Sequence, residues 1–111
     1  MSEKFKNVIE EVKNRTAKFD PTSYNGFLAI QVTLTDLGEV FYIEIKDGKM
    51  SIEPHEYNDR QANIIMKSDN FIKTIYGELN TVFALTTGKL KIEGDLTKAK
   101  ELSSLFKGGS R

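Results

Sequence analysis

Three consecutive stretches in the first half of the chain alternate between apolar and polar residues. They cover residues 28–34, 40–46 and 49–53. Successive side chains of a β-strand point to opposite faces, so a period of two places every second residue on one side. Asp47-Gly48 separates the last two stretches and favours a tight hairpin turn, because both residues tolerate positive φ. The pattern predicts an antiparallel meander whose inward face is made by Leu28, Ile30, Val32, Leu34, Phe41, Ile43, Ile45, Met50 and Ile52.

Helical spacing dominates both flanks of this meander. Near the start, Phe5, Val8, Ile9 and Val12 recur on one face of a helix that Ser2 can cap. The polar segment 54–61 is expected to be an exposed loop. The second half then predicts a strand at 62–66, a helix capped by Ser68, a short helix at 82–85, a strand at 90–92 and a last helix from 95 to 106.

Short strands with one apolar face, and helices gathered toward both ends of the chain, are typical of the α+β class. We expect one mostly antiparallel sheet of five strands, with helices covering a single face. A length of 111 residues predicts one domain spanning residues 1–111.

Composition excludes several classes of function. Sixteen basic residues balance sixteen acidic ones, so no general field attracts nucleic acid, and no nucleic-acid partner is expected. The absence of cysteine removes thiol chemistry and disulfides. No apolar run approaches the roughly 20 residues needed to span a bilayer, and the first residues lack an apolar signal segment. We therefore expect a cytoplasmic protein.

No constellation of catalytic residues is visible, and we predict neither an enzyme, nor a metal site, nor a cofactor. His55 is the single histidine and lies in a polar loop, where a solvated side chain is the simpler explanation. The carboxylates Glu10-Glu11 fit the polar face of a helix, and Asp95 fits a helix cap. Gly88-Lys89 does not fit a phosphate-binding loop, because Leu90 follows where that motif has Ser or Thr.

The second half of the chain resembles a known family. The most specific run is Gly88-Lys-Leu-Lys-Ile-Glu-Gly-Asp95, preceded by the strand 62–66 and by Asp69-Asn70-Phe71. Further matching positions are Gly77, Asn80, Ala84, Ala99 and Leu102. In this order the residues resemble the sterol carrier protein 2-like domains, with weaker similarity back to Gly26. That family implies a five-stranded sheet covered by helices, with an apolar tunnel for lipid between the two layers.

Periodicity alone favours a plain hydrophobic core for these apolar positions, whereas the resemblance favours a ligand tunnel. The resemblance implies non-enzymatic binding and carriage of a sterol, fatty acid, acyl-CoA or isoprenoid, with the last two helices as a lid. Transient contact with a membrane is compatible with that role. The expected wall residues are Phe41, Ile43, Ile64, Met66, Ile75, Phe83, Leu85, Leu90, Ile92, Leu102, Leu105 and Phe106.

An accessory module that assists a lipid-related enzyme through protein contacts is the alternative function. The sequence departs from vertebrate-type members of the family at four places around the expected tunnel mouth. Phe41 replaces a Trp, Glu78 a Lys, Thr81-Val82 a Pro-Gln pair and Thr87 a Gln. The chain ends in Ser-Arg and lacks a peroxisomal tripeptide, so we expect a free-standing prokaryotic member.

Overall fold

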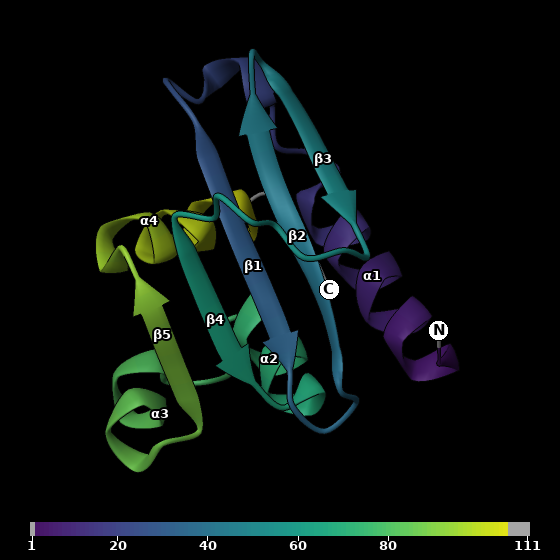
Figure 1. Cartoon of the computed structure of the whole chain (residues 1–111), viewed down its shortest axis with the longest axis vertical. Coiled ribbons are helices and arrows are strands. Elements are labelled where there is room, and N and C mark those ends of the chain that lie inside the picture. Colours follow the sequence, from purple (N-terminus) through teal and green to yellow (C-terminus); the bar gives the residue numbers. More distant parts are fainter. Residues whose placement is uncertain (1, 107–111) are drawn as a thin grey trace.

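The computed structural model describes residues 2–106 and alternates helices with strands along the chain (Figure 1). The elements are α1 (Glu3–Thr16), the 3₁₀ turn η1 (Pro21–Ser23), β1 (Leu28–Leu34), β2 (Glu39–Lys46), β3 (Lys49–Glu53), β4 (Ala62–Met66), α2 (Ser68–Ile75), α3 (Thr81–Thr87), β5 (Leu90–Gly94), α4 (Leu96–Glu101) and the 3₁₀ helix η2 (Leu102–Phe106). This order confirms the α+β class.

The five strands form one sheet in the order β3-β2-β1-β4-β5. Neighbouring strands are antiparallel except β1 and β4, which run parallel with Val32 opposite Ile64. The sheet is therefore mixed but mostly antiparallel, as predicted. At its edge, β5 comes so close to β4 that a Cβ on Gly94 would lie 2.6 Å from the Gln61 carbonyl oxygen. Only glycine fits there, which explains the last glycine of the Gly-Lys-Leu-Lys-Ile-Glu-Gly run.

The hydrophobic core lies on the inner face of the sheet, where the helices pack (Figure 1). The inward residues expected on β1 and β2 are completely buried, from Leu28 to Ile45. Phe5 of α1, Phe41 of β2 and Phe71 of α2 form a chain of aromatic contacts with ring centroids 6.2 Å and 5.6 Å apart. These contacts attach α1 and α2 to the β1–β2 half of the sheet.

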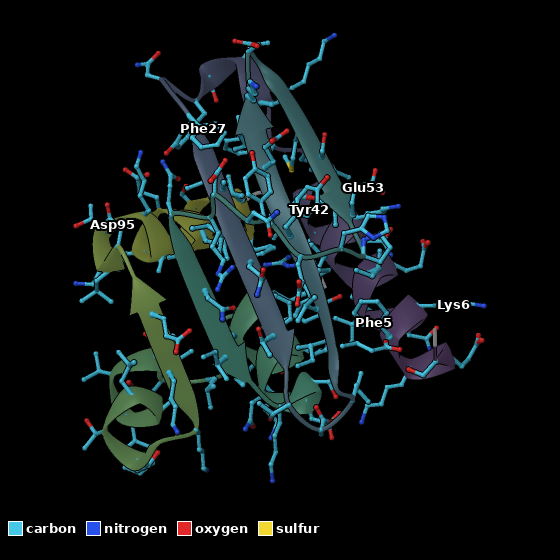
Figure 2. All side chains as sticks on the ribbon, in the orientation of Figure 1. Phe5, Lys6, Phe27, Tyr42, Glu53 and Asp95 are labelled. Atoms are coloured by element: carbon cyan, nitrogen blue, oxygen red, sulfur yellow. The ribbon has the colours of Figure 1, made fainter. Side chains whose placement is uncertain are left out.

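The outer face is partly covered by the β3–β4 loop, although its polar sequence predicts an exposed segment. Tyr57 is half-buried and donates its backbone N–H to Gln31 Oε1 at 3.0 Å and its hydroxyl to Glu44 Oε2 at 2.6 Å. The rings of Tyr57 and Tyr42 form a T-shaped pair with their centroids 5.0 Å apart. Figure 2 shows Tyr42 on the outer face of the sheet. The bond to Glu44 and burial together raise the pKa of Tyr57 to about 12. The expectation holds for His55 and Glu56, which are exposed, but not for Tyr57.

The N-terminus of α2 corrects a second expectation. Ser68 is not the cap of this helix but its first residue, and it is completely buried. The cap comes from Asp36 in the β1–β2 turn, which accepts the Ser68 backbone N–H at 2.8 Å and the Ser68 hydroxyl at 2.7 Å. Burial opposes ionisation of the Asp36 carboxyl, but the hydrogen bonds from Ser68 outweigh it and lower the pKa below its usual value.

The last predicted helix is shorter than expected. Asp95 caps α4 as predicted, accepting the backbone N–H of Lys98 at 3.1 Å. After Glu101 the chain tightens into η2. The hydroxyls of Ser103 and Ser104 bond the carbonyls three residues earlier, at 2.9 Å and 2.8 Å. Such local bonds compete with regular helix geometry, which accounts for the change.

Replacing Asp36 by Ala should destabilise the protein by about 1–2 kcal/mol, because it removes a helix cap and leaves the buried Ser68 hydroxyl without this acceptor. Asp20→Ala is the matched control, since Asp20 accepts the same two kinds of bond from the exposed Thr22. Urea unfolding of both variants measures the difference. An equal loss in the two variants would contradict a role for long-range capping.

The Asp47-Gly48 hairpin is confirmed, with φ of 53° and 75° and Lys46 paired to Lys49. Gly48→Val should cost more than about 1 kcal/mol, because a β-branched side chain resists positive φ. Gly48→Asn should cost less, since Asn tolerates this region. Coincident urea midpoints for the two variants would show that the turn geometry does not limit stability.

Candidate functional site

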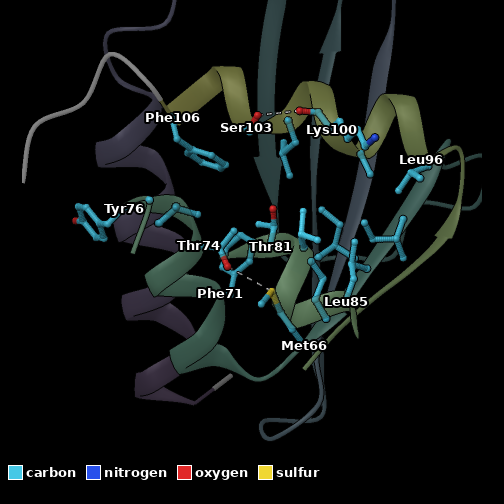
Figure 3. A pocket seen from close by; sticks show the side chains of 18 of the residues that line it. Met66, Phe71, Thr74, Tyr76, Thr81, Leu85, Leu96, Lys100, Ser103 and Phe106 are labelled. Carbon is cyan, nitrogen blue, oxygen red and sulfur yellow. Dashed lines mark hydrogen bonds between the residues drawn. The ribbon is translucent and has the colours of Figure 1, made fainter. Parts of the chain in front are cut away.

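A pocket of about 390 Å³ lies against the inner face of β4 and β5 (Figure 3). The sheet forms one wall, α2, α3, α4 and η2 supply the others, and α1 contributes Arg15. The lining residues are Arg15, Ile64, Met66, Phe71, Thr74, Ile75, Tyr76, Gly77, Thr81, Val82, Leu85, Leu90, Ile92, Leu96, Ala99, Lys100, Leu102, Ser103 and Phe106.

The alternation of β4 and β5 creates the floor of the pocket. Ile64 pairs with Ile92, and Met66 pairs with Leu90, so all four side chains point to the inner face. The aromatic contacts between α1, β2 and α2 fill the other half of the sheet and stop at Phe71, which also lines the pocket. Phe71 therefore stands on the boundary between the packed core and the open pocket.

The wall opposite β4 comes from α4 and η2, which cross the inner face behind the sheet (Figure 1). Ala99, Leu102 and Phe106 are buried and line the pocket. Figure 3 shows Phe106 near one end of this wall and Leu96 near the other. The amphipathic spacing predicted for the last helix thus places a continuous apolar stripe over the pocket.

Several polar groups around the pocket already have protein partners. Thr74 donates its hydroxyl to the Asn70 carbonyl at 2.8 Å, and Ser103 donates to the Lys100 carbonyl at 2.9 Å. Arg15 donates Nε–H to the Ile75 carbonyl at 3.1 Å, and its guanidinium lies 4.8 Å from the centre of the Tyr76 ring. The surface left for a ligand is therefore mainly hydrocarbon, with Arg15 and Lys100 as the charged groups and no acidic residue in the lining.

Eight of the twelve residues expected from the sequence line this pocket, and the structure brings them together from five elements. They are Ile64, Met66, Ile75, Leu85, Leu90, Ile92, Leu102 and Phe106. Phe41, Ile43 and Leu105 lie elsewhere in the core and are completely buried. Phe83 also lies outside the pocket, with 58% of its surface exposed.

Two physical reasons explain why these four residues lie outside this pocket. The alternation along a strand shows which face of the sheet a residue lies on, but not which helix covers it. Phe41 and Ile64 were therefore both expected in the pocket wall. The short helix α3 buries only Ala84; Val82 and Leu85 line the pocket, whereas Phe83 does not. Phe71 and Leu96 line the pocket but were not among the expected wall residues, because no sequence pattern shows which helix positions face the pocket.

Nothing among residues 2–106 suggests a metal centre, since no three His, Cys, Asp or Glu side chains gather closely enough to hold an ion. His55 is exposed in the β3–β4 loop and is not part of the pocket lining. In the same part of the chain, every helix is too short or too polar to cross a bilayer.

Comparison with known sequences identifies the family of this chain. The model of the SCP-2 sterol transfer family matches residues 5–107. Sterol carrier protein 2 of Homo sapiens is 32% identical over 63 residues, which cover 57% of this chain and 12% of that protein. Peroxisomal multifunctional enzyme A of Dictyostelium discoideum is 28% identical over 85 residues, or 76% of this chain and 19% of that enzyme. The chain thus spans less than a fifth of either relative.

The fold agrees with solved structures. Sterol carrier protein 2 of Aedes aegypti, determined by NMR in complex with the C16 fatty acid palmitate, superposes with a TM-score of 0.68 at 18% identity, over 99% of this chain and 100% of that one. Its similarity concerns the fold, while the match to the family model covers nearly the whole sequence. This chain, matched by the family model from residue 5 to residue 107, belongs to the SCP-2 sterol transfer family.

Proposed function

We propose that this protein binds a single-chain lipid with an anionic head group, such as a long-chain fatty acid, and carries it without catalysing a reaction. Membership of the family and the palmitate complex of the Aedes aegypti protein support lipid binding in general. The observation that carries the proposal is the hydrocarbon-lined pocket over β4 and β5. Burial of apolar ligand surface there would supply about 25 cal/mol per Å² before the costs of association.

The volume of the pocket favours a slender ligand. Its 390 Å³ lies near the lower end of the usual range for small-molecule sites, about 300–1,000 Å³. A water molecule takes up about 30 Å³ in the liquid, and a methylene group is similar in size, so roughly a dozen such groups fit. One acyl chain matches that space, whereas a lipid with two chains exceeds it.

The charges beside the pocket favour an anionic head group. Arg15 and Lys100 are the cations of the lining, which contains no carboxylate; the nearby carboxylate of Glu11, one turn before Arg15 on α1, accepts the hydroxyl of Tyr76. Arg15 is half-buried and held by the Ile75 carbonyl and the Tyr76 ring, so its guanidinium is already oriented before a ligand arrives. Lys100 is exposed and has more conformational freedom to lose. We therefore assign the head group to the Arg15 end of the pocket.

An accessory role beside an enzyme is the second candidate. The support for it is that matching regions occupy small parts of larger proteins, such as the Dictyostelium discoideum multifunctional enzyme. Such a module would bind protein rather than lipid through its exposed apolar residues. Lipid extracted with the purified protein favours carriage, whereas a partner complex that forms in the absence of lipid favours the accessory role.

Palmitate should raise the melting temperature of delipidated protein, because a ligand at one hundred times its Kd stabilises the folded state by about 2.7 kcal/mol. Calorimetry with palmitate, palmitoyl-CoA, cholesterol and farnesol ranks the ligand classes. We expect the largest shift for palmitate and the smallest for cholesterol. A set of four unchanged melting temperatures would refute lipid carriage.

Ile92→Ala should weaken palmitate binding on the order of tenfold, since each buried methylene contributes about 0.8 kcal/mol. Ile52→Ala is the matched control: both residues are half-buried on edge strands, but only Ile92 lines the pocket. Titration calorimetry measures both affinities, and urea unfolding checks that both variants fold. If Ile52→Ala weakens binding as much as Ile92→Ala, the ligand does not occupy this pocket.

Arg15→Gln should reduce the affinity for palmitate and leave the affinity for hexadecanol almost unchanged, because only palmitate carries a charge. Lys100→Gln should have a smaller effect on palmitate. The comparison is made by competition against a fluorescent fatty acid. Equal losses for palmitate and hexadecanol in Arg15→Gln would place the head group elsewhere.

A further inference from the structure

The sheet has two edge strands, and β3 is the one that lies away from the pocket (Figure 1). Its sequence is Lys49-Met-Ser-Ile-Glu53, and among the described residues it pairs only with β2. An edge strand presents backbone N–H and C=O groups that can pair with another chain. Bulges and prolines commonly block such edges, but β3 contains no proline and its register with β2 is unbroken. This edge can therefore accept a further strand.

The hairpin determines which backbone groups of β3 face outward. Its two-residue turn makes Lys46 and Lys49 the hydrogen-bonded pair that closes it. Hydrogen-bonded and non-hydrogen-bonded pairs alternate along an antiparallel ladder. Ser51 is therefore also bonded to β2, whereas the N–H and C=O groups of Met50 and Ile52 point toward the free edge. No backbone hydrogen bond from outside the sheet reaches these groups among residues 2–106.

Two antiparallel copies of β3 complement each other when a two-fold axis passes between their Ser51 residues. Met50 then lies opposite Ile52 of the second copy, and the backbone groups that these residues exchange are the ones that already face outward. Both side chains lie on the apolar inner face, where they continue the pairs with β2. On the outer face, Lys49 lies opposite Glu53 of the second copy at each end of the strand. Every pair in this register is thus apolar, small and polar, or oppositely charged.

The charges at the two ends of β3 are available for this contact. Lys49 and Glu53 are exposed, and neither belongs to a salt bridge within residues 2–106. A lysine on an edge strand normally opposes association, but here each lysine meets a glutamate because the strand carries opposite charges at opposite ends. The other edge strand, β5, suits self-pairing less, since Glu93 already accepts a hydrogen bond from Asn63 and Gly94 offers no side chain.

We infer that a second copy of this chain pairs with β3 around a two-fold axis and joins two five-stranded sheets into one of ten strands. The contact is isologous, because the same strand serves both copies. It involves the five residues of β3, fewer than the roughly 20–30 residues a side of a stable complex, so association is weak and depends on protein concentration. The pocket lies against β4 and β5, on the half of the sheet away from this interface.

Charge reversal tests the pairing. Lys49→Glu and Glu53→Lys should each weaken dimerisation on the order of tenfold, because both charged pairs of the dimer become repulsive. An equimolar mixture of the two variants should dimerise again, since every glutamate then faces a lysine. The control is Lys91→Glu, which changes an exposed lysine of β5 and should have little effect. Sedimentation equilibrium at low ionic strength measures all four samples. No recovery in the mixture, or an equal loss in Lys91→Glu, would overturn the inference.

The absence of cysteine allows a direct test of the register. Opposite residues of a non-hydrogen-bonded pair have Cα atoms about 4.5 Å apart, within the range of a disulfide. Ser51→Cys should therefore form an intermolecular disulfide under mild oxidation much faster than Asn58→Cys, although Ser51 is half-buried and Asn58 is exposed. Faster cross-linking of Asn58→Cys, or equal rates, would indicate random collision and contradict an axis at Ser51.

A proline separates backbone pairing from side-chain contact. Ile52→Pro removes an N–H that faces the second copy but no hydrogen bond to β2, so it should abolish dimerisation, whereas Ile52→Ala keeps the N–H and should retain most of it. Urea unfolding checks that both variants fold. Parental dimerisation of Ile52→Pro would refute strand pairing, and so would an unsubstituted protein that stays monomeric over the whole concentration series. The affinity for palmitate should be parental in Lys49→Glu, so dimerisation and lipid binding are judged separately.

Discussion

The pocket exists because the helices do not pack closely over the whole apolar face of the sheet. Burial of hydrocarbon is favourable wherever it occurs, so the inner face drives the packing of α1 and α2 without fixing which strands they cover. The contacts from Phe5 through Phe41 to Phe71 hold both helices toward β1 and β2. The face of β4 and β5 is then left to short elements, α3, α4 and η2, which enclose a space instead of filling it.

Local rules predicted most of the fold. A period of two gave the inner faces of β1 and β2, whose residues are completely buried, and Asp47-Gly48 gave the hairpin because its backbone conformation suits these two residues. Eight of the expected wall residues line the pocket, since the strands and the last helix have clear apolar faces. The division between core and pocket was not predictable, because it is set by the position of α1 relative to the sheet.

Contacts between distant residues account for the other differences. The side chain that caps α2 is Asp36, which lies in a turn far from Ser68 in the sequence, and local patterns cannot reveal such a partner. Tyr57 lies over the outer face because Gln31 and Glu44 accept its hydrogen bonds, although its loop looks solvated. The helix that contains Phe83 was expected, but its orientation was not. This helix, α3, has seven residues and buries only Ala84, so its sequence does not show which side faces the core.

The parallel pairing of β4 with β1 has a consequence for the order of folding. The meander β1–β2–β3 forms through short connections, whereas β4 must return across the sheet to pair with β1, and β5 pairs only with β4. Contacts between distant residues require loop closure first and form late. Core substitutions in the meander should therefore slow folding, whereas those in β5, α3 or α4 should mainly accelerate unfolding, and the two arms of a chevron plot distinguish these effects. The half of the molecule that encloses the pocket would then be the last to assemble and the first to open.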